Sequence, residues 1–423
     1  MNKKSIQGLQ IIGFYPNSQL AQSGVEKGDW LVQYNGEKIK DEEHLKELKL
    51  KYQNTLKVII MIVKKDEEEQ YFEILPGDLG LYLAEISASP KISEDAKRIE
   101  NIGRLEIRTG KENTFFHSLH RLLQIFDLEI EVEQLLIFSC FPFRIQFRKE
   151  LTENLVDPTY GFDCSKVLFD NLGISFKSYI NKNSDSKIKK EIINSIERGF
   201  PVLARGLFGE DDWGIVTGYQ NNKKDFFCRS FHDNTIDYSL AREIPDKIIV
   251  FNAKPDFSDI KENNFINQHK RCLSQARDLF FIKEYKNFYQ GNKSIKKWIE
   301  FLEDDEYFSE IERDKFTEIF FANDTLFTTF QHNCIIVYEY LEKLQQQEIF
   351  PESKRHLRRL IKFYKAESKI LEDCLKNISR NTSKNLKKSW SKRSRGKEVT
   401  ALNKIYKKNR EIITVIDKLP LIL

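Results

Sequence analysis

The sequence predicts a multidomain α+β protein with a β-rich N-terminal region, a mixed middle region and an all-α C-terminal region. Its 423 residues are enough for about two to four domains. Short apolar runs alternate with turn residues in the first 86 positions, whereas residues 257–423 show helical spacing almost throughout. Pro, Ser and Asp mark joints near residues 87–100 and 254–260. We therefore expect domains at residues 1–86, 100–253 and 257–423.

The near-neutral charge of the chain hides one strongly basic segment. The total of 68 Lys and Arg against 64 Asp and Glu gives a net charge of +4. Residues 376–410 hold 13 Lys or Arg and one Glu, so the rest of the chain carries −8. Candidate contacts for an anionic partner are Lys387, Lys388, Lys392 and Arg393. The alternative is a solvated basic linker over residues 377–397. A nucleic-acid partner is not expected, because no recognised nucleic-acid-binding fold is visible.

The composition argues against a membrane-spanning or disulfide-bonded protein. No run of about 18 apolar residues occurs, and residues 1–8 lack an apolar signal core. The six cysteines are scattered without a CxxC pair, which fits neither a zinc site nor a disulfide framework. We therefore expect a cytoplasmic protein with no transmembrane segment, metal or cofactor.

The N-terminal region has cap and turn residues between its apolar runs. The pattern predicts strands at residues 9–15, 30–34, 56–63 and 70–75, and helices at 18–23 and 41–50. Asp41 is a candidate N-cap, with Leu45 and Leu48 on one face of the second helix. Asn35-Gly36 predicts a tight turn because both residue types tolerate a positive φ.

These residues resemble a bacterial-type PDZ domain over about 80 residues. The match comprises residues 17–25 (NSQLAQSGV), 27–31 (KGDWL) and 34–36 (YNG). The resemblance implies recognition of an extended peptide or protein C-terminus by strand addition. The candidate residues for the carboxylate loop fall in two groups: Leu9, Gln10 and Ile11, or Leu79, Gly80 and Leu81. Another alternative is a docking domain whose groove is occupied by its own chain.

The middle region places helical patterns before a run of strands, which is an α+β arrangement. Helical patterns occupy residues 113–126, 162–171 and 187–198, with an apolar segment at 133–138. Strands are expected at 201–206, 213–219 and 226–230. This order resembles the papain-like fold of the peptidase C39-like group, and within it the N-terminal domain of the butirosin-biosynthesis acyltransferase family. The resemblance covers about 150 residues and rests on residues 114–123, 141–147, 212–219 and 227–231.

The resemblance implies a pseudoenzyme. Active members need a Cys at the start of the first helix and a His at the head of the strand before Gly-Tyr. Thr114 stands at the first position, and Asp212 or Trp213 at the second. The residues expected to line the degenerate cleft are Thr114, Asp212, Trp213, Tyr219, Arg229 and His232. The leading hypothesis is a peptide- or partner-binding scaffold.

The rival hypothesis is an active thiol peptidase or acyl/peptidyl transferase with a displaced Cys–His pair. Cys164 follows Asp163 at a predicted helix start, where the helix dipole favours a thiolate. His232 and Asp233 would complete the set, and Cys140 is a second candidate nucleophile. The opposing interpretation treats both cysteines as small buried apolar residues.

The C-terminal third predicts helices at residues 267–284, 294–303, 310–321, 324–347, 351–379 and 399–419. Gly291–Leu302 and residues 331–334 resemble the helical tails of relatives of the C39-like group. The run His332-Asn333-Cys334 has catalytic residue types, but neighbours on a helix point about 100° apart and cannot share one substrate. We therefore expect a structural Asn333 and a packed Cys334.

Overall fold

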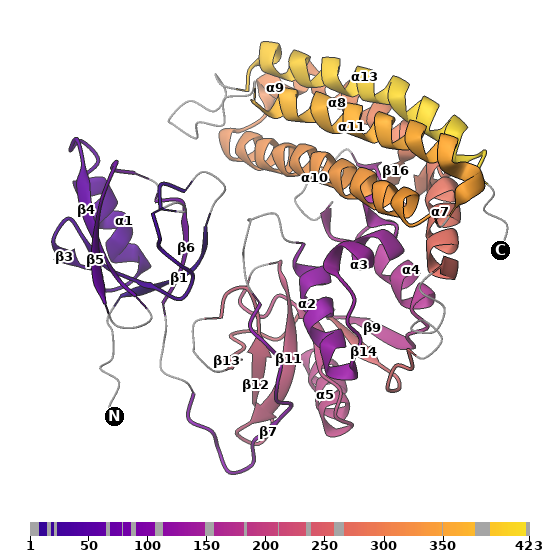
Figure 1. The fold of residues 1–423 in the computed structure, drawn as a ribbon. Coiled ribbons are helices and arrows are strands. Elements are labelled where there is room, and N and C mark those ends of the chain that lie inside the picture. The colour runs from indigo at the N-terminus through magenta and orange to yellow at the C-terminus, as the bar shows by residue number, and fades with distance from the viewer. Residues whose placement is uncertain are drawn as a thin grey trace. The chain divides into compact units, whose positions relative to one another are not determined.

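The computed structural model has a mixed α+β architecture with a helical C-terminal region, which confirms the predicted fold class at that level (Figure 1). The chain divides into two compact units, residues 1–129 with 176–254 and residues 130–175 with 255–423. Residues 130–175, which the sequence pattern placed in the middle domain, thus belong with the helical region. The structure describes residues 8–14, 18–20, 23–64, 68–77, 79–85, 90–105, 113–148, 156–181, 184–209, 211–233, 238–257, 266–348, 350–376 and 390–419.

The first unit contains an N-terminal antiparallel sheet with the strand order β5-β4-β2-β1-β6. Its strands are β1 (Leu9–Phe14), β2 (Trp30–Tyr34), β4 (Val58–Val63), β5 (Glu69–Ile74) and β6 (Leu81–Glu85), and β3 (Glu37–Lys38) pairs with β2. The helix expected at residues 18–23 falls partly outside the described residues. Leu9 and Ile11 of β1 are fully buried, as are Val58, Ile60 and Ile62 of β4. Their spacing of two places one face of each strand in the core.

Helix α1 (Glu42–Lys51) begins where the sequence predicts. The Asp41 carboxylate accepts a hydrogen bond from the His44 backbone nitrogen at 2.7 Å and so caps the helix. Leu45 and Leu48 are buried. Asn35 and Gly36 take φ values of 52° and 81°, which forms the tight turn between β2 and β3. These local predictions are confirmed.

The first unit also contains a second sheet with the order β13-β12-β11-β10-β14-β9, and β7 pairs with β11. Its strands are β7 (Lys97–Arg98), β9 (Phe176–Ile180), β10 (Val202–Arg205), β11 (Trp213–Gln220), β12 (Asp225–Arg229), β13 (Ser239–Leu240) and β14 (Lys247–Phe251). Helices α2 (Thr114–Leu123) and α5 (Asp185–Glu197) pack against β11 and β10. β11 is buried along its whole length, so this strand is the centre of the core.

The second unit consists mainly of helices, which lie side by side in Figure 1 where α10, α11 and α13 pack together. They are α3 (Val132–Phe138), α4 (Cys164–Asn171), α7 (Ile266–Phe281), α8 (Gly291–Leu302), α9 (Asp305–Glu310), α10 (Arg313–Gln346), α11 (Lys354–Lys376) and α13 (Lys392–Ile416). The prediction of an all-α region is incomplete, because β15 (Glu284–Tyr285), β16 (Phe288–Gln290) and β8 (Gln146–Phe147) form a small sheet. No helix within the described ranges is long and apolar enough to cross a membrane.

Helix α10 is continuous over 34 residues, so the predicted break between residues 321 and 324 is wrong. Asn residues weaken helices when their side chains bond to the nearby backbone. Here the Asn323 side chain bonds elsewhere. Its Oδ1 accepts from the Trp298 indole nitrogen at 2.8 Å, and its Nδ2 donates to Glu398 at 3.2 Å. The helix therefore continues through this position.

Two residues at the described end of the basic segment, Trp390 and Arg395, are buried, whereas Lys392, Arg393, Gly396 and Lys397 are exposed. Residues 377–389 lie outside the described residues, so the prediction of an exposed linker stays a prediction there.

Trp390 is fully buried among the rings of Phe308, Phe316 and Phe320, with centroids 5.3–5.4 Å away. Helix α13 begins at Lys392 rather than near residue 399. We call the contact of Trp390, Arg395 and Glu398 with the helices around them the Trp390 latch.

Polar groups complete the Trp390 latch. The Trp390 indole nitrogen donates to both carboxyl oxygens of Glu398 at 3.1 Å. Arg395 donates to the Leu302 carbonyl oxygen at 3.2 Å and to Asp305 at 2.8 Å. Burial raises the pKa of Glu398 to about 8, so this acid is held largely protonated at neutral pH. Apolar packing and paired polar groups thus fix a segment whose composition alone suggests solvation.

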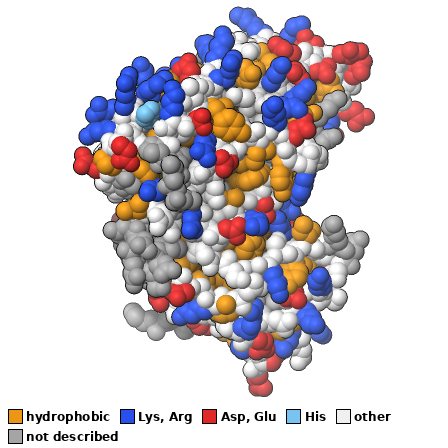
Figure 2. Space-filling model, turned by 90° about the vertical axis from the view of Figure 1, so that its right-hand side faces the viewer, with side chains coloured by type: hydrophobic (Ala, Val, Ile, Leu, Met, Phe, Trp, Pro, Cys, Tyr) orange, Lys and Arg blue, Asp and Glu red, His pale blue; other side chains and the backbone are white. Residues whose placement is uncertain are grey.

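The four basic residues proposed to contact an anionic partner have different surroundings. Lys387 and Lys388 lie outside the described residues. Lys392 forms an ion pair with Asp305, and Arg393 is exposed. Figure 2 shows basic and acidic side chains interspersed on one face of the molecule. The anionic partner therefore stays a prediction.

Candidate functional site

The start of α2 lies against the head of β11, the two places singled out for catalytic groups. The Thr114 Oγ1 accepts a hydrogen bond from the Trp213 backbone nitrogen at 3.1 Å. Ser118, one turn later on the same helix face, donates from Oγ to the Trp213 carbonyl oxygen at 3.1 Å. The two hydroxyls hold both backbone polar groups of Trp213. Only the spacing of Ser118 from Thr114 could have pointed to its role from sequence.

The Trp213 side chain belongs to the core. It is 2% exposed and packs edge-on against Phe115, with ring centroids 5.1 Å apart and planes at 85°. A ring buried to this degree cannot line an open cleft. The contact between Thr114 and Trp213 is therefore a junction between helix and strand.

His232 and Asp212 form a half-exposed pair beside this junction. The His232 Nε2 lies 3.0 Å from the Asp212 Oδ2, and each side chain is 42% exposed. A His–carboxylate pair is the orienting half of many acid–base sites, which also need a nucleophile within reach. The described contact of the Thr114 hydroxyl is with the Trp213 amide, which donates to Oγ1 and cannot take its proton. Asp212 stands just before β11, and His232 follows the neighbouring strand β12. No local sequence pattern predicted that these two side chains would pair.

Asp233 was predicted to pair with His232 in a catalytic set, but it pairs with Arg229 instead. It is buried, accepts from the Ser230 backbone nitrogen at 2.9 Å and lies 3.5 Å from Arg229. Burial raises the pKa of Asp233 to about 6, although the Arg229 charge opposes the shift. The predicted set of Cys164, His232 and Asp233 is therefore replaced by two separate pairs.

Tyr219 and Arg229 were also expected to line the cleft, but their side chains contact other parts of the first unit. Tyr219 is six residues along β11 from Trp213, or about 20 Å at ~3.3 Å per residue. It donates to Glu197 at the other end of the strand. Arg229 is buried, donates from Nε to the Ile102 carbonyl oxygen at 3.0 Å and stacks 3.9 Å from the centre of the Tyr238 ring.

The candidate nucleophiles Cys164 and Cys140 are fully buried. Cys164 begins α4 behind its cap Asp163, as predicted, but burial raises the pKa of its thiol to about 12 instead of lowering it. Burial also raises the pKa of Cys140, whose Sγ lies 3.9 Å from that of Cys272. All six cysteines of the chain are buried. A displaced thiol site therefore has no support in this geometry.

Thiol labelling should reflect this burial. We expect Ellman's reagent at neutral pH to label less than one thiol per native chain over several minutes, and six after denaturation. A Leu56→Cys variant is the control, because Leu56 is 92% exposed and its thiol should react at once. A wild-type cysteine that reacts as fast as this control would support the rival hypothesis of an active thiol enzyme.

The structure distinguishes between the two groups of candidate peptide-binding residues. Leu9 and Gln10 lie on β1, which pairs with β2 on one side and with β6 on the other. Ile11 also pairs with β6, and its backbone nitrogen donates to the Asp29 carbonyl oxygen at 2.8 Å. Both sides of β1 are thus occupied at residues 9–11, so a peptide strand cannot pair with this group of residues.

The second group, residues 79–81, leads into β6, the end strand of the sheet, which begins at Leu81. Among the described strands, β6 pairs with β1 alone. Gly80 has a φ of +66°, and a Cβ on it would lie 2.5 Å from the Ser18 Cα, so only glycine fits this turn. The Ser18 hydroxyl donates to the Leu79 carbonyl oxygen at 3.1 Å. The turn into β6 is thereby fixed.

Helix α1 packs against both β6, the end strand, and β2. Leu83 of β6 is half-buried and packs on the apolar core to which Leu45 and Leu48 of α1 belong. A strand edge, a neighbouring helix and an apolar floor are the elements of a groove for an extended peptide.

Neither a metal site nor a relative supplies further evidence of function. In the parts of the chain that the structure describes, no three His, Cys, Asp or Glu side chains gather in a way that could hold a metal ion. No protein-family model matches the chain, and no curated protein is similar to it. The function must be inferred from the geometry of the sites themselves.

Proposed function

We propose that the protein is a peptide- or partner-binding scaffold with a PDZ-type N-terminal domain and a papain-like, C39-type pseudoenzyme domain. The observation that carries the proposal is the position of β6 at the end of the described N-terminal sheet, with α1 packed against it. An extended peptide would add to β6 as a further strand. Main-chain hydrogen bonds would supply affinity, and the side chains of β6 and α1 would supply specificity.

The alternatives at the same sheet have less support. β1 is paired on both sides, so the candidate loop at residues 9–11 cannot take a peptide strand. β5 is the other end of the sheet, whereas the partners against which α1 packs are β2 and β6. The glycine turn at residues 79–81 leads directly into β6. In this proposal, the carboxylate of a peptide C-terminus lies at that turn.

The geometry of the middle domain favours a binding role over thiol chemistry. Thr114 and Ser118 bond to the backbone of Trp213, and the six cysteines are buried. The positions that would carry a nucleophile and a base in an active relative of this fold are thus used to hold α2 on β11. This supports a pseudoenzyme domain.

The test is a screen of peptide libraries with free C-termini against the full chain, with affinities measured by fluorescence polarisation. A selected peptide should lose at least about tenfold in affinity when alternate backbone nitrogens are methylated, because strand addition needs those donors. Hydrogen exchange of the complex should slow in residues 79–85.

Matched variants locate the groove. Leu83→Ala should weaken binding, because it removes part of the apolar floor, while Leu56→Ala, at a position 92% exposed, should not. Protection at β5 instead of β6, or equal binding by methylated peptides, would refute the proposed site.

A further inference from the structure

Helix α11 carries a row of cations that no part of the proposed function uses. It packs against α10 and α13 with its apolar side (Figure 1). Residues 353–366, at the start of this helix, contain six Lys or Arg and no Asp or Glu. Four basic side chains here are exposed and lie at helical spacings of three and four: Arg355, Arg358, Arg359 and Lys362. We call these four residues the α11 cationic face.

The charges of the α11 cationic face are not balanced by acidic side chains. None of the four forms an ion pair or a hydrogen bond with another residue that the structure describes. The acids of α10 that lie beside α11 pair with other lysines. Glu348 lies 3.7 Å from Lys354, and Glu342 lies 2.7 Å from Lys365. The face therefore keeps four positive charges on two turns of one helix.

The positive charge extends from α11 to α13. The guanidinium of Arg359 lies 5.8 Å from the centre of the Phe363 ring, and the Lys408 ammonium of α13 lies 5.1 Å from the same centre. Lys408 is shared with Glu411 of its own helix, at 3.5 Å. Two neighbouring helices thus present cations on either side of one ring.

The position of these cations on α11 is unfavourable for the helix itself. The N–H groups of a first helical turn carry partial positive charge, so acidic residues stabilise this end and basic residues destabilise it. α11 has no acidic residue in its first turn, and Arg355 and Arg358 lie in its first two turns. Cations that oppose the dipole and have no acidic partner do not serve the stability of the fold. They indicate an external anion.

The surroundings of the face distinguish between classes of anionic partner. A protein partner needs an apolar interface core, because exposed ion pairs contribute little each, and a bilayer takes up apolar side chains beside the cations. Among the described residues, the large apolar side chains that are exposed all lie outside α11. Single strands need aromatic rings on which bases stack, whereas Phe363 and Tyr364 are 9% and 4% exposed. A nucleic-acid duplex needs cations alone, because its phosphates release counterions on binding.

We propose that the α11 cationic face binds double-stranded nucleic acid through its phosphates, without reading the base sequence. Arg355 and Lys362 are seven residues apart, or about 10 Å along the helix axis, which spans several phosphates of one strand. Three of the four residues are Arg, whose planar guanidinium bonds two phosphate oxygens at once. The lack of a recognised nucleic-acid-binding fold argues against base reading and not against contact with phosphates.

Fluorescence anisotropy of the full chain with labelled DNA duplexes of about 20 base pairs tests the proposal. Two duplexes of unrelated sequence should bind with the same affinity. The logarithm of the affinity should fall linearly with the logarithm of the salt concentration between about 50 and 200 mM. Absence of binding to both duplexes at about 50 mM salt would overturn the proposal.

A charge-matched pair of variants locates the site. The double variant Arg355→Gln, Arg358→Gln should lower the affinity at least about tenfold and reduce the salt slope by about 2. The control is Lys46→Gln, Lys315→Gln, which changes the net charge equally at lysines that pair with Glu43 and Glu318. Its salt slope should match that of the wild type. A wild-type slope in the arginine variant would place the duplex elsewhere and refute the assignment.

Thermal melting separates binding from folding. The arginine variant should melt at or above the wild-type temperature, because both side chains oppose the helix dipole and neither forms an ion pair or a hydrogen bond with a described residue. Weaker duplex binding by a variant that melts at or above the wild-type temperature supports a direct contact.

Two further measurements test the rival partners. The first is sedimentation with vesicles of phosphatidylserine and phosphatidylcholine, and the second is competition between poly-glutamate and the labelled duplex. Binding to vesicles without binding to the duplex would assign the face to lipid headgroups. Displacement of the duplex by poly-glutamate as effective as that by unlabelled duplex would assign it to an acidic polypeptide. Either result would contradict the proposal.

Discussion

Replacing Trp390 with alanine is expected to lower the free energy of unfolding by about 3–5 kcal/mol. The side chain is fully buried against Phe308, Phe316 and Phe320, so its removal leaves a cavity among three rings. It also leaves the Glu398 carboxyl without its indole donor. We expect the largest single-residue effect in the second unit at this position.

Urea unfolding followed by circular dichroism checks this prediction. The matched control is Phe281→Ala, which truncates an aromatic residue of the same unit that is 56% exposed, and it should cost less than about 1 kcal/mol. Trp390→Phe should fall between the two, because it keeps most of the packing and loses the indole N–H. Equal losses for Trp390→Ala and Phe281→Ala would show that the latch does not stabilise the fold.

Replacing Glu398 with glutamine is expected to remove a pH dependence from the stability of the protein. Burial raises the pKa of Glu398 to about 8 in the folded chain, against about 4.5 for an exposed Glu. Between these values the folded state binds a proton that the unfolded state has lost, so stability falls as pH rises, by roughly 1.4 kcal/mol per pH unit. Trp390, Asn323 and Arg395 oppose the upward shift and do not cancel it.

Melting temperatures from pH 5 to pH 8.5 measure this effect as a difference from the wild type. Glu398→Gln should gain stability over the wild type as pH rises and approach it near pH 5. Glu411→Gln, which changes an exposed acid of the same helix, should follow the wild type throughout. The difference isolates Glu398 from other buried groups such as His269, whose pKa burial lowers to about 4. A constant difference across this range would contradict a protonated Glu398.

Local features of the fold were predictable from sequence because their signals are local. The cap of α1 at Asp41, the Asn35-Gly36 turn and the spacing of Leu45 and Leu48 each depend on a few neighbouring residues. The start of α13 was not predictable in this way. Its first turn is basic, and the burial of Trp390 just before it depends on contacts with rings at least 70 positions earlier in the chain.

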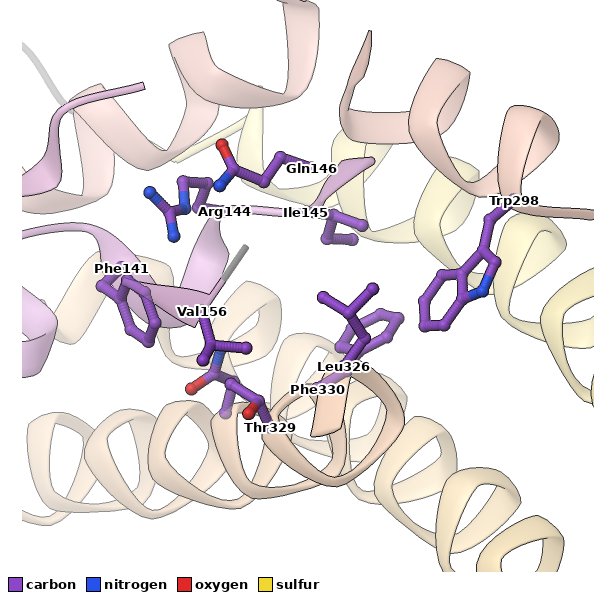
Figure 3. Close-up of a pocket in the computed structure, with 10 residues that line it drawn as sticks. Phe141, Arg144, Ile145, Gln146, Val156, Trp298, Leu326, Thr329 and Phe330 are labelled. Carbon is purple, nitrogen blue, oxygen red and sulfur yellow. The ribbon is translucent and has the colours of Figure 1, made fainter. Parts of the chain in front are cut away.

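The candidate sites show the same limit. The sequence pattern predicted that Thr114 and Trp213 lie close together, at the start of a helix and the start of a strand. The contact of Ser118 with Trp213 and the pairing of His232 with Asp212 were seen only in the structure. One pocket of the second unit is lined by both Arg144 and Asn333, which are 189 positions apart (Figure 3). No spacing rule connects such residues.

The division of the chain into interleaved units has a consequence for synthesis on the ribosome. Residues 130–175 emerge well before the segments that bury them: Asn171 bonds to Gln275 at 2.8 Å, and β8 pairs with β16. At about 5–20 residues per second, the apolar helix α3 waits on the order of ten seconds for these partners. During that time residues 176–254, which complete the strands of the first unit, are synthesised. Newly made chains are therefore most exposed to misassembly at residues 130–175, the part of the molecule whose place is decided last.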